Sequence, residues 1–517
     1  MRRKDLTWKL MAVVAMVVLI SLSLVGYIVN AAHSTPHNAS QDTSRNARHR
    51  YITSKTYMPI VSKDWSPQAP QLVHLSWAVD DVYHTMAAVW WTPGPAASKM
   101  VYDTTSHEDP SDYRFIALGT AYHIAPEEDR HGNPIETIFP GQFHEVDLDG
   151  LTPGTLYYFR VGGDGFWSRE WSFRTIGLDQ DVKFIVGGDS RRPWGAEEIK
   201  YTPHAISNWP YARDWVTINA AQEDPDFIWF SGDMVNSGNS FENWKNWLES
   251  MQENLVTEEG RMIPIVGVIG NHELGAYPDV ESTPAWFQGI FANPGDELTF
   301  SLNFPNLHLT TLRADGGCVG TWWAPAEEEA EEQKDWLQSD LQGSDAEWKL
   351  VGFHVPYFSC FEQGTGHPSE PFLYHWWDIL QNPDYGADAV FCGHVHDFMR
   401  SWPISITNVV TTTVDQPWTE VGYKAVYTMT RRSEDGVTYV VQGSWGAPTD
   451  PYIKGTACDI RDFVAAGAAI PSYTIVEVGG TEALTLTTKA ISGDVLDEVT
   501  LHYTTEEFET PEYNCLY

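Results

Sequence analysis

Five short, largely apolar segments between residues 182 and 392 are each followed at once by side chains of the kinds that bind metal ions. The segments have the length and composition of buried strands, and they are Val182–Gly187, Asp226–Ser231, Met262–Ile269, Lys349–Phe353 and Ala387–Cys392. Amphipathic or acidic helical stretches separate them, which is the pattern of an α/β fold. Because ligands of open α/β sheets bind at the carboxyl ends of strands, we expect the polar residues at these five ends to meet in one site.

The residues that follow the segments form the candidate metal centre. They are Asp189, Asp233, Asn271, His354, His394 and His396. Carboxylate, amide and imidazole groups together suit Zn, Mn or Fe. Four of the motifs begin with a glycine, which permits a tight turn and a close approach of the backbone to a ligand. A single Gly-Asp pair or a lone histidine carries little information, but six such residues in this order predict a metal-binding site.

The order of these motifs resembles that of the calcineurin-like metallophosphoesterase superfamily and, within it, of the purple acid phosphatases. The run Gly393–Arg400, Gly-His-Val-His-Asp-Phe-Met-Arg, is similar to the Gly-His-Val-His-x-Tyr-Glu-Arg signature of that branch. The spacing of Gln333, Trp336, Leu337, Asp340 and Leu341 is similar to the branch's helix before the histidine-bearing strand. The resemblance extends over residues 65–505. It implies a four-layer αββα sandwich over residues 180–505, preceded by a small all-β domain.

The resemblance also implies a role for each matching residue. Asp233 would bridge two divalent or trivalent metal ions, drawn from Fe, Mn and Zn. One site would be completed by Asn271, His354 and His394, and the other by Asp189 and His396. His272 would be a catalytic group beside the leaving oxygen rather than a metal ligand.

Two positions depart from the family patterns. The superfamily has a histidine where this chain has Arg191, and purple acid phosphatases have an iron-binding, colour-giving tyrosine where it has Asn236. The site of Asp189, Asp233 and His396 therefore has three evident protein ligands, or a fourth in Asn236. We expect this site to hold its metal less tightly than the other. We predict that Arg191 clamps the phosphate, since guanidinium matches phosphate oxygens in geometry. The alternative is an arginine that only pairs with a neighbouring acid.

The activity implied by the resemblance is the hydrolysis of small phosphate monoesters. Two cations about 3.5–4 Å apart can activate a water molecule and bind the phosphoryl oxygens, while His272 protonates the leaving alkoxide. One alternative is a phosphodiesterase or nucleotidase with the same metal core, whose specificity would lie in the loops Asp315–Pro325 and Tyr357–Pro371. Another alternative is a surface binding protein that keeps the fold without catalysis. The sequence makes no prediction of the oligomeric state.

Residues 65–176 show a different pattern of short β-rich runs separated by turn residues, which indicates a small β-sandwich. The stretch Leu148–Val161 resembles the strand–turn–strand corner of fibronectin type III-like domains. The stretch Trp167–Thr175 resembles the end of the N-terminal domain of purple acid phosphatases. We interpret this region as a structural module.

The N-terminal residues 1–32 have the pattern of an export signal. Basic residues precede a mostly apolar run over residues 10–29, and small residues follow, with a potential cleavage position after Ala31. The run is also just long enough to span a bilayer, so a cleaved signal peptide and an uncleaved membrane tether are both open. In either case the remainder of the chain is predicted to be exported or extracytoplasmic, with residues 33–64 as a flexible linker.

The charge balance excludes some partners. The chain of 517 residues has 32 basic and 70 acidic residues, a net charge of −38. Nucleic acids and anionic membrane surfaces bind to clusters of Lys and Arg, so neither is an expected partner by charge.

Five cysteines are present, and an exported chain permits disulfides. Cys392 lies in an apolar run and is predicted to be a buried free thiol. Of the three pairings open to the other four, we favour Cys318–Cys360 with Cys458–Cys515.

Overall fold

The structure is a computed structural model of the chain. It describes residues 66–124, 139–191, 212–274, 284–314, 326–357, 370–416, 419–429, 436–449, 463–480 and 483–502. The chain divides into two units, residues 1–63 and 64–517, and every described residue belongs to the second unit. The predicted signal or anchor, the linker and four of the five cysteines lie outside the described residues. No helix in the described part is long and apolar enough to cross a membrane.

The first part of the second unit is all-β and consists of two antiparallel sheets. One has the order β1 (Gln71–Ser76), β2 (Met86–Thr92), β6 (Gln142–Leu148) and β5 (Thr120–Tyr122). The other has the order β4 (Phe115–Leu118), β3 (Lys99–Asp103), β7 (Leu156–Gly163) and β8 (Phe166–Trp167), with β9 (Trp171–Arg174) also beside β7. The sequence predicted an all-β region here, and its likeness to fibronectin type III domains stays a prediction.

Gly119 lies where the chain passes from β4 in one of these sheets to β5 in the other. A Cβ atom at Gly119 would lie 1.8 Å from the carbonyl oxygen of Glu145, so only glycine allows this close approach. The sequence analysis did not identify β3, β4 or β5.

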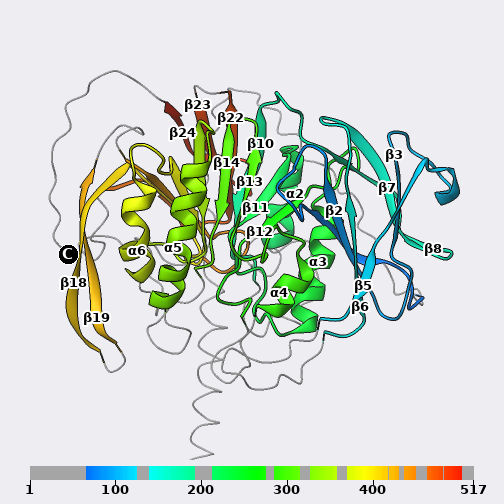
Figure 1. The fold of residues 1–517 in the computed structure, drawn as a ribbon, viewed down its shortest axis with the longest axis horizontal. Coiled ribbons are helices and arrows are strands. Elements are labelled where there is room, and N and C mark those ends of the chain that lie inside the picture. Colours follow the sequence, from blue (N-terminus) through cyan, green and yellow to red (C-terminus); the bar gives the residue numbers. More distant parts are fainter. Residues whose placement is uncertain are drawn as a thin grey trace, which may run out of the picture. The chain divides into compact units, whose positions relative to one another are not determined.

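The next part contains two larger sheets (Figure 1). The six-stranded sheet has the order β12 (Ile265–Gly267), β11 (Phe227–Phe230), β10 (Val182–Gly187), β22 (Ser472–Gly479), β23 (Ala483–Ala490) and β24 (Val495–His502). Strands β10, β11 and β12 are parallel to one another, and the other pairs are antiparallel. All five strands predicted around the candidate site are present; β10 has the predicted bounds, and the other four differ at one or both ends.

The seven-stranded sheet has the order β13 (Phe300–Phe304), β14 (Leu307–Thr311), β15 (Trp348–Gly352), β16 (Ala389–Cys392), β20 (Thr438–Gln442), β17 (Phe398–Ser401) and β21 (Val464–Ala468). Strands β14, β15, β16 and β20 are parallel. A two-stranded hairpin, β18 (Ile404–Gln416) and β19 (Thr419–Met429), follows β17. Cys392, at the end of β16, is buried and free, as predicted.

Alternation along the strands builds four layers. Ile185 and Ile228 belong to a core with the helices α2 (Ala212–Gln222), α3 (Phe241–Asn254) and α4 (Ala285–Ile290). Phe184 and Phe227, one position away, pack toward the other sheet, because successive strand residues face opposite sides. The seven-stranded sheet packs its other face against α5 (Ala326–Gly343) and α6 (Glu370–Leu380), which Figure 1 shows opposite α2, α3 and α4. The predicted αββα architecture is confirmed.

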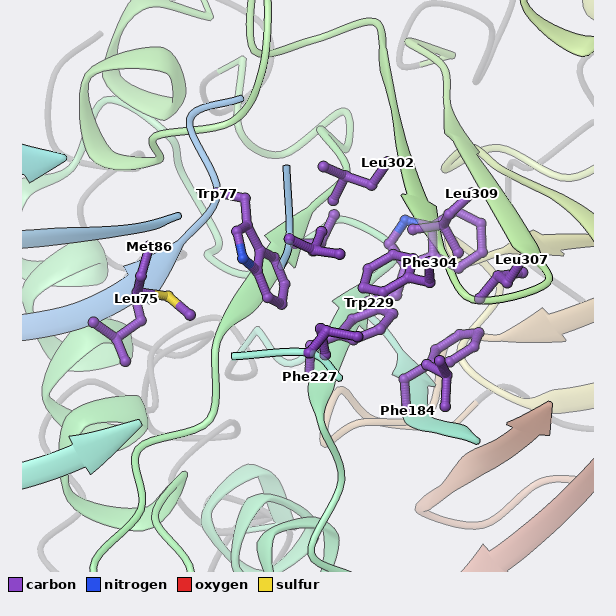
Figure 2. Packing of buried hydrophobic residues seen from close by; sticks show 14 of the residues in the cluster. Leu75, Trp77, Met86, Phe184, Phe227, Trp229, Leu302, Phe304, Leu307 and Leu309 are labelled. Carbon is purple, nitrogen blue, oxygen red and sulfur yellow. The ribbon is translucent and has the colours of Figure 1, made fainter. Parts of the chain in front are cut away.

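Aromatic side chains fill the core between the two sheets (Figure 2). The ring of Phe227 stacks on both Phe184 and Phe304, with centroids 4.7 Å apart in each case. Trp77, which follows β1 of the all-β part, approaches Phe227 and Phe304 edge-on at 5.8 and 5.9 Å. The all-β part therefore shares this core with the two large sheets.

The buried His144 is expected to make the all-β part sensitive to acid. Its buried ring stacks on Trp90, and its two nitrogens lie 2.8 Å from the hydroxyls of Thr92 and Ser98. Burial lowers the pKa of His144 to about 4, whereas an unfolded histidine titrates near 6.5. Below pH ~6.5 the unfolded state therefore binds a proton that the folded state refuses, until both are protonated below pH ~4. We expect this to remove up to ~3 kcal/mol of stability across that interval.

The His144→Gln variant tests this expectation, because glutamine keeps hydrogen bonding but does not titrate. Thermal unfolding at pH 7 and pH 4 should show a smaller acid-induced loss of Tm for the variant than for the wild type. An equal loss in both proteins would contradict the assignment.

Candidate metal centre

The residues singled out in the sequence follow the carboxyl ends of β10, β11, β12, β15 and β16. The loops that carry them are joined by backbone hydrogen bonds. The N–H of Asp189 donates to Gly232 O at 2.9 Å, and that of Ser190 donates to Asp233 O at 3.0 Å. The N–H of Gly393 donates to His354 O at 2.9 Å. Two further bonds, from His354 Nδ1 to Ser231 O and from the N–H of His394 to Asp189 Oδ2, each 2.7 Å long, join strand ends of the two large sheets.

One group of donor atoms lies around Asp233, His354 and His394, all within 4.8 Å of one another. His354 Nε2 is 3.2 Å from Asp233 Oδ1. The amide oxygen of Asn271 lies 3.1 Å from His354 Nε2 and 3.0 Å from His394 Nδ1. These four side chains are the ones expected to hold one metal.

A second group lies around Asp189, Asp233 and His396, again within 4.8 Å of one another. Asp233 belongs to both groups, which is the geometry expected of a bridging carboxylate. Asp189 is fully buried, and its Oδ2 accepts the N–H of His394 at 2.7 Å, but its Oδ1 has no hydrogen-bond partner. A buried carboxylate oxygen without a hydrogen bond raises the free energy of the folded protein, so this atom is suited to binding a cation.

Backbone carbonyls fix the orientation of two imidazoles. Ser231 O lies 2.7 Å from His354 Nδ1, and Pro448 O lies 2.9 Å from His396 Nδ1. A carbonyl only accepts, so each Nδ1 carries a proton and each Nε2 faces the cluster. Burial and the charge of Arg191 lower the pKa of His396 to about 3, so this ring is neutral, which is the form that binds metals.

Burial and neighbouring charges together shift the pKa values of the two carboxylates in opposite directions. It raises the pKa of Asp189 well above its usual range, and the charge of Asp233 adds to this effect. Burial also opposes ionisation of Asp233, but the charges of His354 and His272 outweigh it and hold the pKa of Asp233 well below its usual range. The burial of a second carboxylate is therefore unfavourable unless more positive charge is present.

The backbone is strained at three residues of the cluster. Asp189, Asp233 and His394 have φ angles of +58°, +53° and +70°, a region that non-glycine residues rarely adopt. Such conformations cost about 1–3 kcal/mol each and tend to occur at functional sites. Gly232 has φ +97°, and a Cβ atom there would lie 2.5 Å from His354 Nδ1, so glycine is required at that turn.

Glu273 stabilises one of the strained turns, a role that the sequence analysis missed. Its buried carboxylate accepts the N–H groups of Gly270, Asp233 and Met234 at 2.8 Å each, and that of Val235 at 3.3 Å. Three successive N–H groups after β11 thus converge on one anion, which joins this loop to the loop after β12. The only sequence signal was the acidic residue that follows Gly-Asn-His.

A second missed element is the loop after β20. Pro448 O holds His396, and the N–H groups of Trp445 and Ala447 donate to Gly188 O and Asp189 O at 2.9 and 2.8 Å. Backbone carbonyls and N–H groups leave no pattern of side chains in a sequence, so this loop gave no signal.

His272 and Arg191 border the cluster. His272 Nδ1 donates to Asn236 O at 2.8 Å, and its Nε2 lies 3.8 Å from Asp233 Oδ2. Arg191 Nη2 lies 2.9 Å from His396 Nε2, and Arg191 Nε lies 3.6 Å from Asp233 Oδ2. The structure therefore brings together all eight residues that the sequence singled out. The side chain of Asn236 as a further ligand stays a prediction.

Comparison with known proteins places this geometry in a family. Residues 203–398 match the calcineurin-like phosphoesterase model, and residues 70–175 match the model of the purple acid phosphatase N-terminal domain. Five of the six candidate ligands lie within the first match, and Asp189 precedes it.

Individual proteins agree with these two matches. Probable purple acid phosphatase 20 of Arabidopsis thaliana is 27% identical over 365 residues, which are 68% of this chain and 73% of that protein. The Fe(3+)-Zn(2+) purple acid phosphatase 12 of A. thaliana is 22% identical over 66% of each chain. A purple acid phosphatase from yellow lupin seeds has a similar fold, with a TM-score of 0.61 at 15% identity over 84% of this chain and 75% of that one.

The chain therefore contains a calcineurin-like phosphoesterase domain and a purple acid phosphatase N-terminal domain. Its relatives are purple acid phosphatases, so it is a purple acid phosphatase-like metallophosphoesterase.

We predict that Glu273 is needed for the stability of the centre. The Glu273→Ala variant leaves four buried N–H groups without their acceptor, and we expect it to lower the free energy of unfolding by about 3 kcal/mol or more. Thermal unfolding measures the stability of the protein, and metal content measures the integrity of the centre. The exposed Glu258→Ala variant is the control and should change stability by less than about 0.5 kcal/mol. Equal behaviour of the two variants would refute the role of Glu273.

Proposed function

We propose that the chain is an exported phosphatase that hydrolyses phosphate monoesters with water activated by two metal ions. The observation that carries the proposal is the position of the Asp233 carboxylate in both groups of donor atoms. The metal-binding character of the Arabidopsis relative, which is named for iron and zinc, supports the same conclusion.

The ligand roles follow from the two groups. Asn271, His354 and His394 would hold one ion, Asp189 and His396 would hold the other, and Asp233 would belong to both sites. Drawn from Fe, Mn and Zn, the ions would supply an activated water molecule and charge stabilisation for the phosphoryl group. The neutral His396 and Asp189 Oδ1, which accepts no hydrogen bond, are suited to this role, and a metal ion at His396 Nε2 would replace the hydrogen bond from Arg191.

His272 is the group that we assign to the leaving oxygen. Its Nδ1 proton is committed to Asn236 O, so Nε2 is the atom that faces the cluster and can hold a transferable proton. Its side chain is 18% exposed, whereas those of Asp233 and His354 are 1% and 0% exposed, so it lies at the open side of the cluster. Arg191, at 16% exposure, lies on the same rim and can contact the phosphate.

The preference for monoesters rests on the likeness to acid phosphatases. The residues that would favour a diester or nucleotide, Trp322, Trp323, Phe358 and Phe361, lie outside the described residues. Faster hydrolysis of diesters or nucleotides than of other monoesters in a substrate panel would instead identify a phosphodiesterase or nucleotidase. Export is proposed from the basic and apolar pattern of residues 1–32.

We predict that His272→Ala keeps its metal and loses activity. The kcat for p-nitrophenyl phosphate should fall about 10²-fold or more, as expected when an acid catalyst is removed. Metal content measured by plasma mass spectrometry should equal that of the wild type. His84→Ala, in the all-β part, is the control and should keep both. Loss of metal from His272→Ala would make this residue a ligand.

We also predict that the protein has no tyrosinate-to-iron absorption band, because Asn236 stands where the family's tyrosine would be. Chelation should abolish phosphatase activity, and addition of Mn²⁺, Zn²⁺ or Fe²⁺ should restore it. A visible spectrum before and after chelation, with activity at each step, checks both points. A purple protein, or full activity with one metal and no response to a second, would contradict the prediction.

A further inference from the structure

Arg191 stands at the sequence position where the first motif of the general superfamily has a histidine. It lies 2.9 Å from His396 Nε2 through Nη2, and 3.6 Å from Asp233 Oδ2 through Nε. Both residues belong to the group formed by Asp189, Asp233 and His396. Arg191 therefore places a positive charge beside Asp189, Asp233 and His396. This is the ligand set in which the chain differs from the family pattern.

His396 can serve only one partner at a time. Its Nδ1 is committed to Pro448 O, so Nε2 holds the only lone pair available to the cluster. That lone pair accepts an N–H of Arg191 or binds a metal ion, but it does not do both. A metal ion bound by Asp189, Asp233 and His396 therefore has to displace Arg191 from His396.

We propose that Arg191 competes with the metal ion for the Asp189–Asp233–His396 site and, once displaced, binds the phosphate of the substrate. This inference rests on the proposed two-metal function. It makes the second metal ion the weaker of the two, because its binding breaks a hydrogen bond and moves a positive charge. It also couples the ion to phosphate, since a bound phosphate stabilises the displaced position of Arg191.

The coupling is reciprocal. If phosphate raises the affinity for the second metal, the second metal raises the affinity for phosphate by the same factor. In the proposal Arg191 mediates this coupling. A variant without Arg191 should therefore bind the second metal ion and phosphate more independently of each other. A plain phosphate clamp would affect phosphate binding without changing the affinity for the second metal measured in the absence of phosphate.

Metal binding to the chelated protein tests the inference independently of activity. Calorimetric titration with Mn²⁺ gives the affinities of the two sites, first alone and then with inorganic phosphate present. The Arg191→Met variant keeps the length of the side chain but has neither charge nor donors. We expect it to bind the second Mn²⁺ about tenfold or more tightly than the wild type, as the loss of a charge-assisted competitor implies.

The Arg191→His variant restores the imidazole of the general family pattern, and it should bind the second Mn²⁺ at least as tightly as Arg191→Met. Phosphate should strengthen second-site binding in the wild type and have a smaller effect in Arg191→Met. Arg169→Ala, which removes a charge paired with Glu253, is the control and should leave both affinities unchanged. An unchanged affinity for the first Mn²⁺ shows that each variant is folded.

Two outcomes separate the inference from the proposed function. Second-site binding in Arg191→Met and Arg191→His that is no tighter than in the wild type would overturn the competition while leaving the two-metal function intact. A wild type that binds no Mn²⁺ at either site would overturn both.

Discussion

Two carboxylates, Asp189 and Asp233, lie fully buried in one cluster, and the rest of the site depends on the positive charge that this requires. Their pKa values are shifted in opposite directions, because burial opposes ionisation of both and nearby positive charge outweighs burial only at Asp233. Arg191 supplies part of the charge from the protein itself. Bound metal ions would supply the remainder, so metal binding and stabilisation of the buried charges are the same event.

The fold maintains this arrangement through its backbone. The strained residues Asp189 and Asp233 lie just after β10 and β11 of the six-stranded sheet. Hydrogen bonds between the loops hold them in place. Glu273 gathers four N–H groups onto one carboxylate, while carbonyls of Ser231 and Pro448 orient two of the imidazoles. The ligands are thus positioned before a metal arrives, and the strain at Asp233 is offset by bonds that reach two loops.

The sequence predicted the α/β core well because buried parallel strands are apolar runs and their polar ends stand out. The eight candidate residues converge for the same reason. The sequence did not predict the role of Glu273, since its partners are backbone N–H groups, nor the loop after β20, which acts through carbonyls and N–H groups. It also missed β4 and β5, whose exposed residues lack the alternation of a half-buried strand.

Anomalous diffraction from crystals grown with Mn²⁺ tests the central claim most directly, because it locates each ion without reference to activity. The two-metal account predicts two peaks about 3.5–4 Å apart, with the Asp233 carboxylate between them. Asn271, His354 and His394 should surround one peak, and Asp189 and His396 the other. Peaks that do not touch Asp233, or a peak bound by His272, would contradict the account.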